Sequence, residues 1–126
     1  MLLYNSGLTA TNGRLPESFA ECRNLEVLWL QAIALTGPVP PYIGNFTRLT
    51  ILDLSKNNLD GPFPPFPFWA KLRELRLLKL NTNSLSGEIP EGFGAVSPDL
   101  LWVSVYRNRL TGPLPASLGQ AKELRR

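Results

Sequence analysis

The chain has 126 residues, a formal net charge of +3, 44% hydrophobic residues, one cysteine and no histidine. That length fits one domain, and the apolar fraction is typical of a globular protein. One cysteine cannot form an internal disulfide, and without histidine the commonest general base and metal ligand are missing. The composition therefore argues against an enzyme and predicts no metal or other cofactor.

The chain also lacks targeting and nucleic-acid signals. No apolar run approaches the roughly 18 residues of a membrane helix. The opening Met-Leu-Leu-Tyr has neither the charged n-region nor the apolar h-region of a signal peptide. A net charge of +3 is a small excess for a surface that binds phosphates. We predict no membrane segment in this chain and no nucleic-acid partner, and these residues alone do not assign a compartment.

Proline and glycine mark an internal repeat. Gly-x-x-Pro recurs from Gly13, Gly37, Gly61, Gly87 and Gly112, at spacings of 24, 24, 26 and 25 residues. The last four glycines end matching runs, which read LWLQAIALTG, LDLSKNNLDG, LKLNTNSLSG and VSVYRNRLTG. Such a period is typical of stacked supersecondary units.

The repeat resembles the plant-type leucine-rich repeat, whose unit is LxxLxLxxNxLSGxIPxxLGxL. The resemblance runs from about Leu3 to the end, and the S/T-G-x-I/L-P segment is what distinguishes this subclass. Receptor-like kinase ectodomains and inhibitors of cell-wall polygalacturonases carry such repeats. The resemblance implies a cell-surface or extracellular location, with an intracellular one as the alternative.

The pattern predicts an α/β repeat fold, a right-handed solenoid with a parallel sheet on its concave face. L-x-L alternation places leucines on one face of a short strand, and stacked units bury them in columns. The Gly-x-x-Pro corner and a short helical turn would return the chain along the convex side. The expected columns contain Leu28/Leu30, Leu52/Leu54, Leu78/Leu80 and Val103/Val105.

We predict a single domain over residues 1–126, built of about five repeats. The first is irregular, and a three-residue insertion at residues 10–12 would restore Leu3, Ser6 and Leu8 to the template. The third and fourth carry extra residues on the convex side, and the last is truncated. The paired-cysteine cap that the resemblance implies is absent, so we expect the repeats to continue in a longer protein.

Three asparagines, Asn57, Asn83 and Asn108, occupy the turn after each strand. An amide both donates and accepts, so it can satisfy backbone groups exposed at the turn, and an asparagine ladder is usual in the family. Ile33 takes this position in the second unit. We expect that corner to be locally adjusted.

The concave face is the predicted partner-binding surface, because strand alternation turns its variable side chains outward. Trp, Tyr and Arg are enriched at binding hot spots, and the excess of cations favours an acidic peptide or glycan. The candidate site contains Trp29, Gln31, Asp53, Lys56, Lys79, Asn81, Trp102, Tyr106 and Arg107. Asp53 and Lys79 are expected to form a partly exposed cross-strand ion pair.

Three other features have structural explanations beside functional ones. Cys22 falls at a core position. Asn45-Phe46-Thr47 is a glycosylation sequon on the convex turn, although the repeat template alone produces it. The stretch Pro62–Trp69 could be a polyproline ligand, and we favour convex packing of its aromatic residues.

We predict a non-catalytic scaffold that recognises a protein or peptide on its concave face. Three alternatives stay open: the ligand-sensing region of a receptor-like serine/threonine kinase, an inhibitor of a secreted glycan-cleaving enzyme, and a structural fragment without a ligand.

Overall fold

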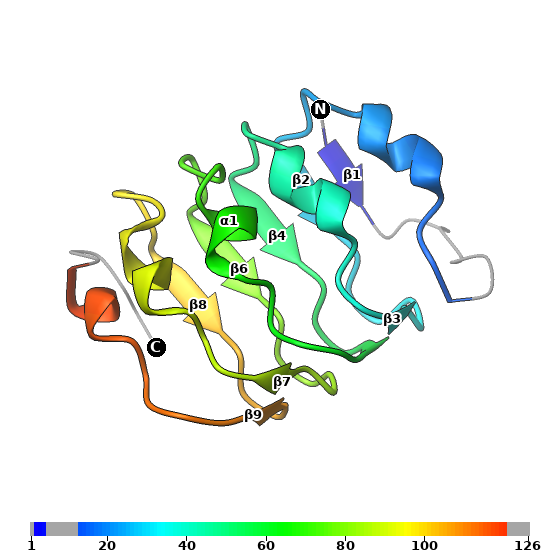
Figure 1. Cartoon of the computed structure of the whole chain (residues 1–126). Coiled ribbons are helices and arrows are strands. Elements are labelled where there is room, and N and C mark those ends of the chain that lie inside the picture. Colours follow the sequence, from blue (N-terminus) through cyan, green and yellow to red (C-terminus); the bar gives the residue numbers. More distant parts are fainter. Residues whose placement is uncertain (1, 5–12, 121–126) are drawn as a thin grey trace.

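The computed structural model describes residues 2–4 and 13–120, which stack as successive turns of a solenoid (Figure 1). The concave sheet contains β1 (Leu2–Tyr4), β2 (Val27–Trp29), β4 (Ile51–Asp53), β6 (Leu77–Lys79) and β8 (Trp102–Ser104). Its strands are all parallel and lie in the order β1-β2-β4-β6-β8. The predicted fold class, a leucine-rich-repeat solenoid with a concave parallel sheet, is confirmed.

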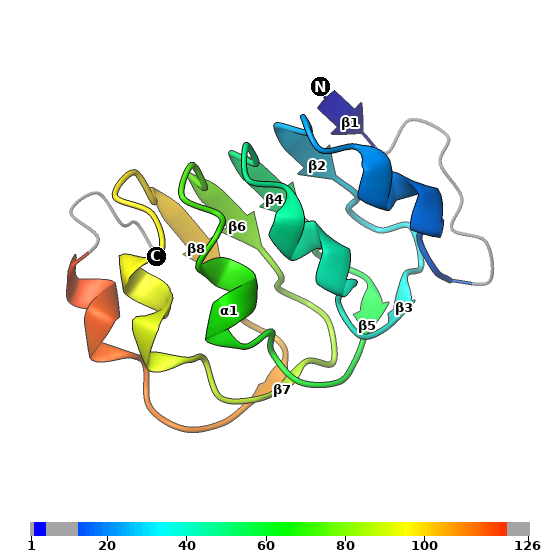
Figure 2. The same cartoon turned by 45° about the horizontal axis from the view of Figure 1, so that its top comes forward.

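Helices cover the convex side, opposite the sheet (Figure 2). They are the 3-10 helices η1 (Glu17–Glu21), η2 (Pro41–Asn45), η3 (Glu91–Ala95) and η4 (Ala116–Gln120), and the short α-helix α1 (Phe66–Trp69). Two small parallel sheets join neighbouring corners: β3 (Thr36–Gly37) with β5 (Asn58–Leu59), and β7 (Ser86–Gly87) with β9 (Arg109–Leu110). Each turn of the chain thus runs from strand to corner to helix.

The core lies between the sheet and the helices. Leu28, Leu52 and Leu78 are aligned in the register and are at most 1% exposed, as are Leu30 and Leu54 of the next column. Burying one such leucine contributes on the order of 1.5–3 kcal/mol. Because the columns run through successive repeats, each unit is stabilised mainly by its neighbours.

Glycine makes the corners possible. The five corner glycines that precede x-x-Pro all have φ between +75° and +77°, a region that other residues adopt only with strain. Adding a side chain would also clash at some of them: a Cβ on Gly13 would lie 2.5 Å from Oγ1 of Thr36. The repeated glycine is therefore a backbone requirement of the turn.

The inserted residues of the third unit form α1 and bring Trp69 into the core. Trp69 is fully buried, stacks on Phe63 at 5.3 Å between ring centroids, and meets Phe93 edge-on at 5.1 Å. Its Nε1–H donates to the carbonyl of Pro64 at 2.7 Å. These contacts agree with convex packing of the aromatic residues and not with a free polyproline ligand.

The first strand has a different register from the one expected. A three-residue insertion would have set Leu3 level with Leu30, but the structure pairs Leu3 with Leu28. In this register the stretch from Leu3 to Gly13 is one residue longer than the stretch from Leu28 to Gly37. Ser6, Leu8 and the expected insertion at residues 10–12 lie outside the described residues.

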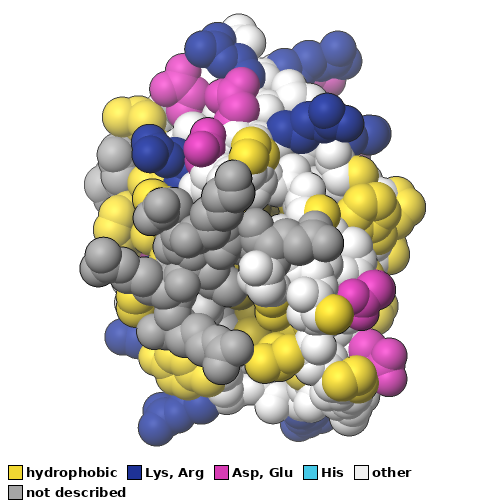
Figure 3. Space-filling model, turned by 90° about the vertical axis from the view of Figure 1, so that its left-hand side faces the viewer, with side chains coloured by type: hydrophobic (Ala, Val, Ile, Leu, Met, Phe, Trp, Pro, Cys, Tyr) yellow, Lys and Arg dark blue, Asp and Glu magenta, His cyan; other side chains and the backbone are white. Residues whose placement is uncertain are grey.

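Charged side chains gather along the edge where each strand begins, which we call the upper rim (residues 23–26, 47–50, 73–76 and 98–101). Viewed from the C-terminal end, Lys, Arg, Asp and Glu side chains crowd the top of the molecule, and hydrophobic side chains lie lower (Figure 3). At this rim Nη2 of Arg48 lies 3.3 Å from Oε1 of Glu26. Both groups are substantially exposed, so this pair contributes little to stability.

Candidate functional site

The concave face presents four columns of variable side chains, and the parallel register sets their order. The first two columns are Val27/Ile51/Leu77/Trp102 and Trp29/Asp53/Lys79/Ser104. The last strand residue is followed, two and three positions later, by the third and fourth columns, Gln31/Ser55/Asn81/Tyr106 and Ala32/Lys56/Thr82/Arg107. All nine predicted site residues therefore belong to one face of the molecule.

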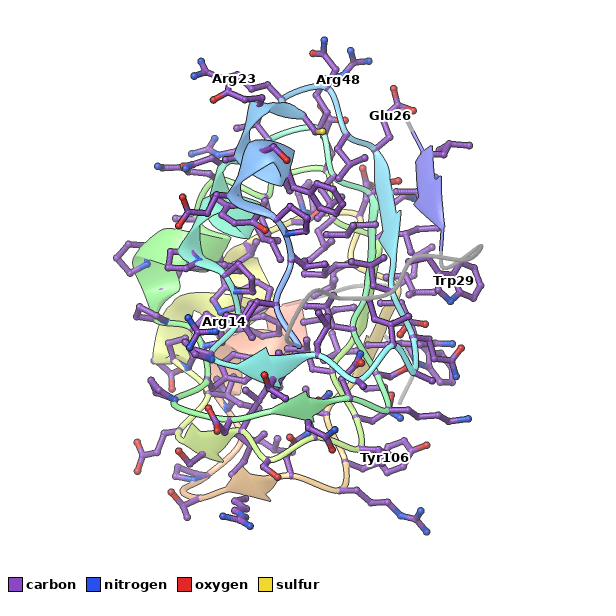
Figure 4. All side chains as sticks on the ribbon, turned by 90° about the vertical axis from the view of Figure 1, so that its right-hand side faces the viewer. Arg14, Arg23, Glu26, Trp29, Arg48 and Tyr106 are labelled. Atoms are coloured by element: carbon purple, nitrogen blue, oxygen red, sulfur yellow. The ribbon has the colours of Figure 1, made fainter. Side chains whose placement is uncertain are left out.

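Three aromatic side chains stand out from this face. Trp29 is 38% exposed, Trp102 is 36% exposed and Tyr106 is 60% exposed. Trp29 and Tyr106 project from the same side of the molecule (Figure 4), and the strand order separates them, since Trp29 lies on β2 and Tyr106 follows β8. Large rings held on or just after short strands offer apolar contact area at a low entropic cost.

Polar residues between the aromatic ones form a buried floor. Asp53, Ser55, Asn81 and Ser104 are between 1% and 9% exposed. Oδ1 of Asp53 accepts hydrogen bonds from the N–H of Ser55 at 3.0 Å and from its Oγ–H at 2.6 Å, and Oγ of Ser104 donates to Oδ1 of Asn81 at 3.1 Å. A floor held by its own hydrogen bonds is pre-organised for contact with a ligand.

Two predictions for these residues are wrong, one about their exposure and one about an ion pair. Asp53 and Asn81 were predicted as exposed contact residues, and both are buried. Within residues 13–120, Asp53 forms no ion pair with Lys79, because Ser55 lies two residues further along the same chain and faces the same side as the carboxylate. The D-x-S spacing was the signal that could have shown this.

Four cations lie on or beside the concave face. Lys56, Arg76 and Arg107 are exposed and Lys79 is half-buried; among the described residues none of the four forms a salt bridge. Two carboxylates lie nearby: Glu26 pairs with Arg48, and Asp53 is buried and accepts hydrogen bonds from Ser55. The described part of this face therefore has more cations than carboxylates, and its net charge is positive.

The fourth column sits on a turn rather than on the strand. Ala32, Lys56, Thr82 and Arg107 have φ between +54° and +60°, a left-handed conformation that costs a non-glycine residue roughly 1–2 kcal/mol. The same conformation recurs in four units, so it belongs to the corner and is stabilised by the neighbouring repeat. For example, the N–H of Lys56 donates to the carbonyl of Asn81 at 3.0 Å.

The first column is apolar and borders a groove that the sequence analysis did not identify. The groove has a volume of about 380 Å³ and is lined by Thr50, Ile51, Arg76, Leu77, Leu101 and Trp102. Arg76 and Leu101 each stand directly before a strand, and Leu101 is 38% exposed. The groove thus combines apolar walls with one exposed guanidinium.

The asparagine corners connect each repeat to the one before it. Nδ2 of Asn83 donates to the carbonyls of Leu54 (3.0 Å) and Leu80 (3.1 Å), and its Oδ1 accepts from the N–H of Leu59 at 3.0 Å. Asn108 repeats this arrangement one unit later, with Leu80, Val105 and Leu85 as partners. These side chains hold the frame under the concave face and lie among backbone groups, not in the candidate site.

Comparisons with known proteins agree with this geometry. The family model described as Leucine Rich Repeat matches residues 48–69 and 74–96. Receptor-like protein 41 of Arabidopsis thaliana is 44% identical over 126 residues, covering 98% of this chain and 14% of that protein. The structure titled PEPR1-AtPEP1 superposes with a TM-score of 0.83 at 31% identity, covering 98% of this chain and 17% of that one. The plant peptide hormone receptor RGFR1, solved in complex with RGF2, gives 0.75 at 33%, with 99% and 17% covered.

The chain belongs to the plant-type leucine-rich-repeat family. It spans about 10–14% of the length of the receptor-like proteins that it matches. No helix of the described residues has the length and apolar character needed to cross a bilayer.

The remaining singled-out residues of this leucine-rich-repeat chain lie on the convex side. Cys22 is half-buried and packs against the core beside η1. Tyr42 lies on η2, and its OH donates to the carbonyl of Pro16 at 3.4 Å. Burial is the largest cause that raises the pKa of Tyr42 above its ordinary value of 10.0. The Glu17 carboxylate and, after it, Cys22 raise this pKa further, because negative charge nearby disfavours the phenolate.

Proposed function

We propose that this leucine-rich-repeat chain is a non-catalytic recognition module that binds an acidic peptide or protein segment on its concave face. The observation that carries the proposal is the juxtaposition of exposed aromatic rings and cations, which form no salt bridge with another described residue, on a pre-organised polar floor. Trp29, Trp102 and Tyr106 are of the residue types that dominate binding energy. An extended chain laid along the sheet would contact them in turn.

Electrostatics favours an acidic partner. Lys56, Arg76 and Arg107 are exposed on or beside this face, whereas the Asp53 carboxylate is buried and Glu26 pairs with Arg48. An excess of charge of one sign speeds the encounter with a ligand of opposite sign and disfavours ligands of the same sign. The groove at Arg76 and Trp102 would take an apolar side chain next to an acidic one.

The related proteins support a receptor context. Several matched relatives are receptor-like proteins, and RGFR1 was solved with RGF2 bound. We infer that this chain is part of the extracellular ligand-sensing region of a larger cell-surface receptor. Any kinase activity would then reside outside these repeats.

The test uses a random peptide library displayed on phage and selected on the immobilised chain. We expect enriched peptides to be acidic and to lose at least about 10-fold in affinity with Trp29→Ala, Tyr106→Ala or Arg107→Ala, a hot-spot loss of at least about 1.4 kcal/mol. Phe66→Ala is the matched control, because Phe66 is 42% exposed but lies on the convex side. Peptides that bind all three concave variants as well as the wild type would show that the concave face is not the site.

A further inference from the structure

A second groove lies on the convex side between η2 and α1. It has a volume of about 430 Å³, and its lining consists mostly of proline rings from two consecutive repeats together with Phe68. Phe68 packs against the η2 backbone, where its ring lies 3.1 Å from the position of a Cβ on Gly44. The inserted residues of the third unit supply Pro65, Pro67 and Phe68, so this groove belongs to one pair of repeats only.

Asn45 and Lys71 line the groove at the C-terminal ends of η2 and α1. Nζ of Lys71 donates to Oδ1 of Asn45 at 3.0 Å, and because an ammonium can only donate, the oxygen of the amide must face it. Nδ2 of Asn45 has no hydrogen bond to another described residue. The amide is therefore fixed by its oxygen, and its nitrogen is left open at the edge of the groove.

Asn45-Phe46-Thr47 is the one Asn-x-Ser/Thr sequence in the chain. Asn45 and Thr47 are exposed, whereas Phe46 is only 1% exposed. A transferase that must bind the sequon in an extended form cannot reach it once Phe46 is buried in the core. Modification at this site would therefore precede folding, and the folded protein would then display its product.

We propose that Asn45 carries an N-linked glycan whose first sugars lie in the proline-lined groove. In the transfer, the bond between Nδ2 and C1 of the sugar forms as the bond between C1 and a lipid-linked diphosphate breaks. Nδ2 loses one proton and the lipid diphosphate leaves. Oδ1 takes no part in this bond, so its contact with Lys71 is compatible with the linked sugar.

The groove matches this occupant in shape and chemistry. A pyranose has an apolar C–H face, which packs on proline rings and on the ring of Phe68, and polar edges that remain in water. The glycan would cover the convex side and leave the concave face free. The proposal rests on the cell-surface location inferred above, because such glycans are added in the secretory pathway.

The modification is tested by secreting the chain from a plant-cell host and measuring its intact mass. We expect a mass increase of one glycan, lost in Asn45→Gln and Thr47→Ala and retained in Thr47→Ser. The double variant N45Q/A95N moves the sequon to the equivalent position of η3, because Ser97 already follows at the right spacing. Wild-type chain secreted at the mass of the bare polypeptide would overturn the proposal, whereas loss of peptide binding would bear only on the concave face.

The position of the glycan is tested by comparing secreted protein with the same sequence from bacterial cytoplasm. We expect the secreted wild type to melt about 2–4 °C higher, and N45Q/A95N to show no such difference between hosts. Nuclear Overhauser contacts between sugar protons and the Phe68 ring should appear in the wild type. A glycosylated wild type with neither effect would show that the sugars do not occupy the groove.

Discussion

The corner at Ile33 and the corner at Asn57 stand at the same place in adjacent repeats and are satisfied in different ways. Asn57 is 7% exposed and donates through Nδ2 to the carbonyls of Leu30 and Leu54, both at 2.9 Å. Oδ1 of Asn57 accepts from the N–H of Leu35, as Oδ1 of Asn83 does from the N–H of Leu59, and at the Ile33 corner it also accepts from the N–H of Ile33, all at 3.0 Å. The asparagine of one unit thus completes the corner of the unit before it.

The backbone differs at the same point. The second unit has two left-handed residues, Ala32 and Ala34, at φ +57° and +59°, where the other described corners have one non-glycine residue in that region. The local adjustment expected at Ile33 is therefore present, and it turns the amide toward the next repeat. Each asparagine accepts a hydrogen bond from the corner of the preceding unit. Removing an asparagine therefore leaves backbone groups of the preceding corner without their partner.

Removing Asn57 should have the largest effect. Asn57→Ala leaves the amides of Ile33 and Leu35 unpaired in a buried corner, each costing about 1–3 kcal/mol, so we expect a loss of at least about 3 kcal/mol. Asn108→Ala should cost less, about 1–2 kcal/mol, because Asn108 is half-buried and water can replace part of its bonding.

Urea unfolding followed by circular dichroism measures both losses. Asn58→Ala is the matched control, since Asn58 is the next residue and its side chain is exposed, and we expect a change within about 0.5 kcal/mol. Equal losses for Asn57→Ala and Asn108→Ala would contradict the added role of Asn57 in binding the N–H of Ile33 besides that of Leu35.

Opposite exchanges at two corners, Ile33→Asn and Asn83→Ile, should give unequal effects. Ile33→Asn gains a donor for the carbonyl of Leu30 but loses half-buried apolar packing, so we expect a change within about 1 kcal/mol. Asn83→Ile removes the partner of the Leu59 amide and should cost at least about 2 kcal/mol. Thermal unfolding of both variants tests this, and a large loss for Ile33→Asn would mean that Ile33 is a core anchor.

Much of the frame could be predicted from the sequence because it repeats. A leucine that recurs at one position of every unit indicates a buried column, and a glycine before x-x-Pro indicates a corner. The places of Leu52 in a column and of Gly61 at a corner could therefore be predicted from the repeat alone. The register of the first strand could not be predicted, because its stretch differs in length from the others and pairing depends on the neighbouring strand. Trp69 falls in an insertion, and its burial depends on Phe63 and Phe93 from two units.

The candidate site could be predicted only in outline. Alternation placed all four columns on one face, but it does not distinguish Trp29, which is exposed, from Asp53, which is buried beneath its surroundings. The groove at Arg76 combines residues before the strand with residues on it, a combination that strand periodicity does not reveal. These features depend on side chains from different repeats, which a single unit does not contain.

The smallest expected effect lies in the second left-handed residue of the Ile33 corner. Ala34→Gly removes the contact between Cβ and backbone that makes φ +59° unfavourable, and it adds the entropy cost of glycine in the unfolded chain. Because the first term is about 1–2 kcal/mol and the second about 0.4–1, we expect a net gain of roughly 0.5–1 kcal/mol. Ala95→Gly, in η3 and with negative φ, has only the second term and should lose stability. Opposite signs in thermal unfolding would show that Ala34 holds a strained turn that no side chain supports, whereas a loss in both would mean that the next repeat fully compensates the strain.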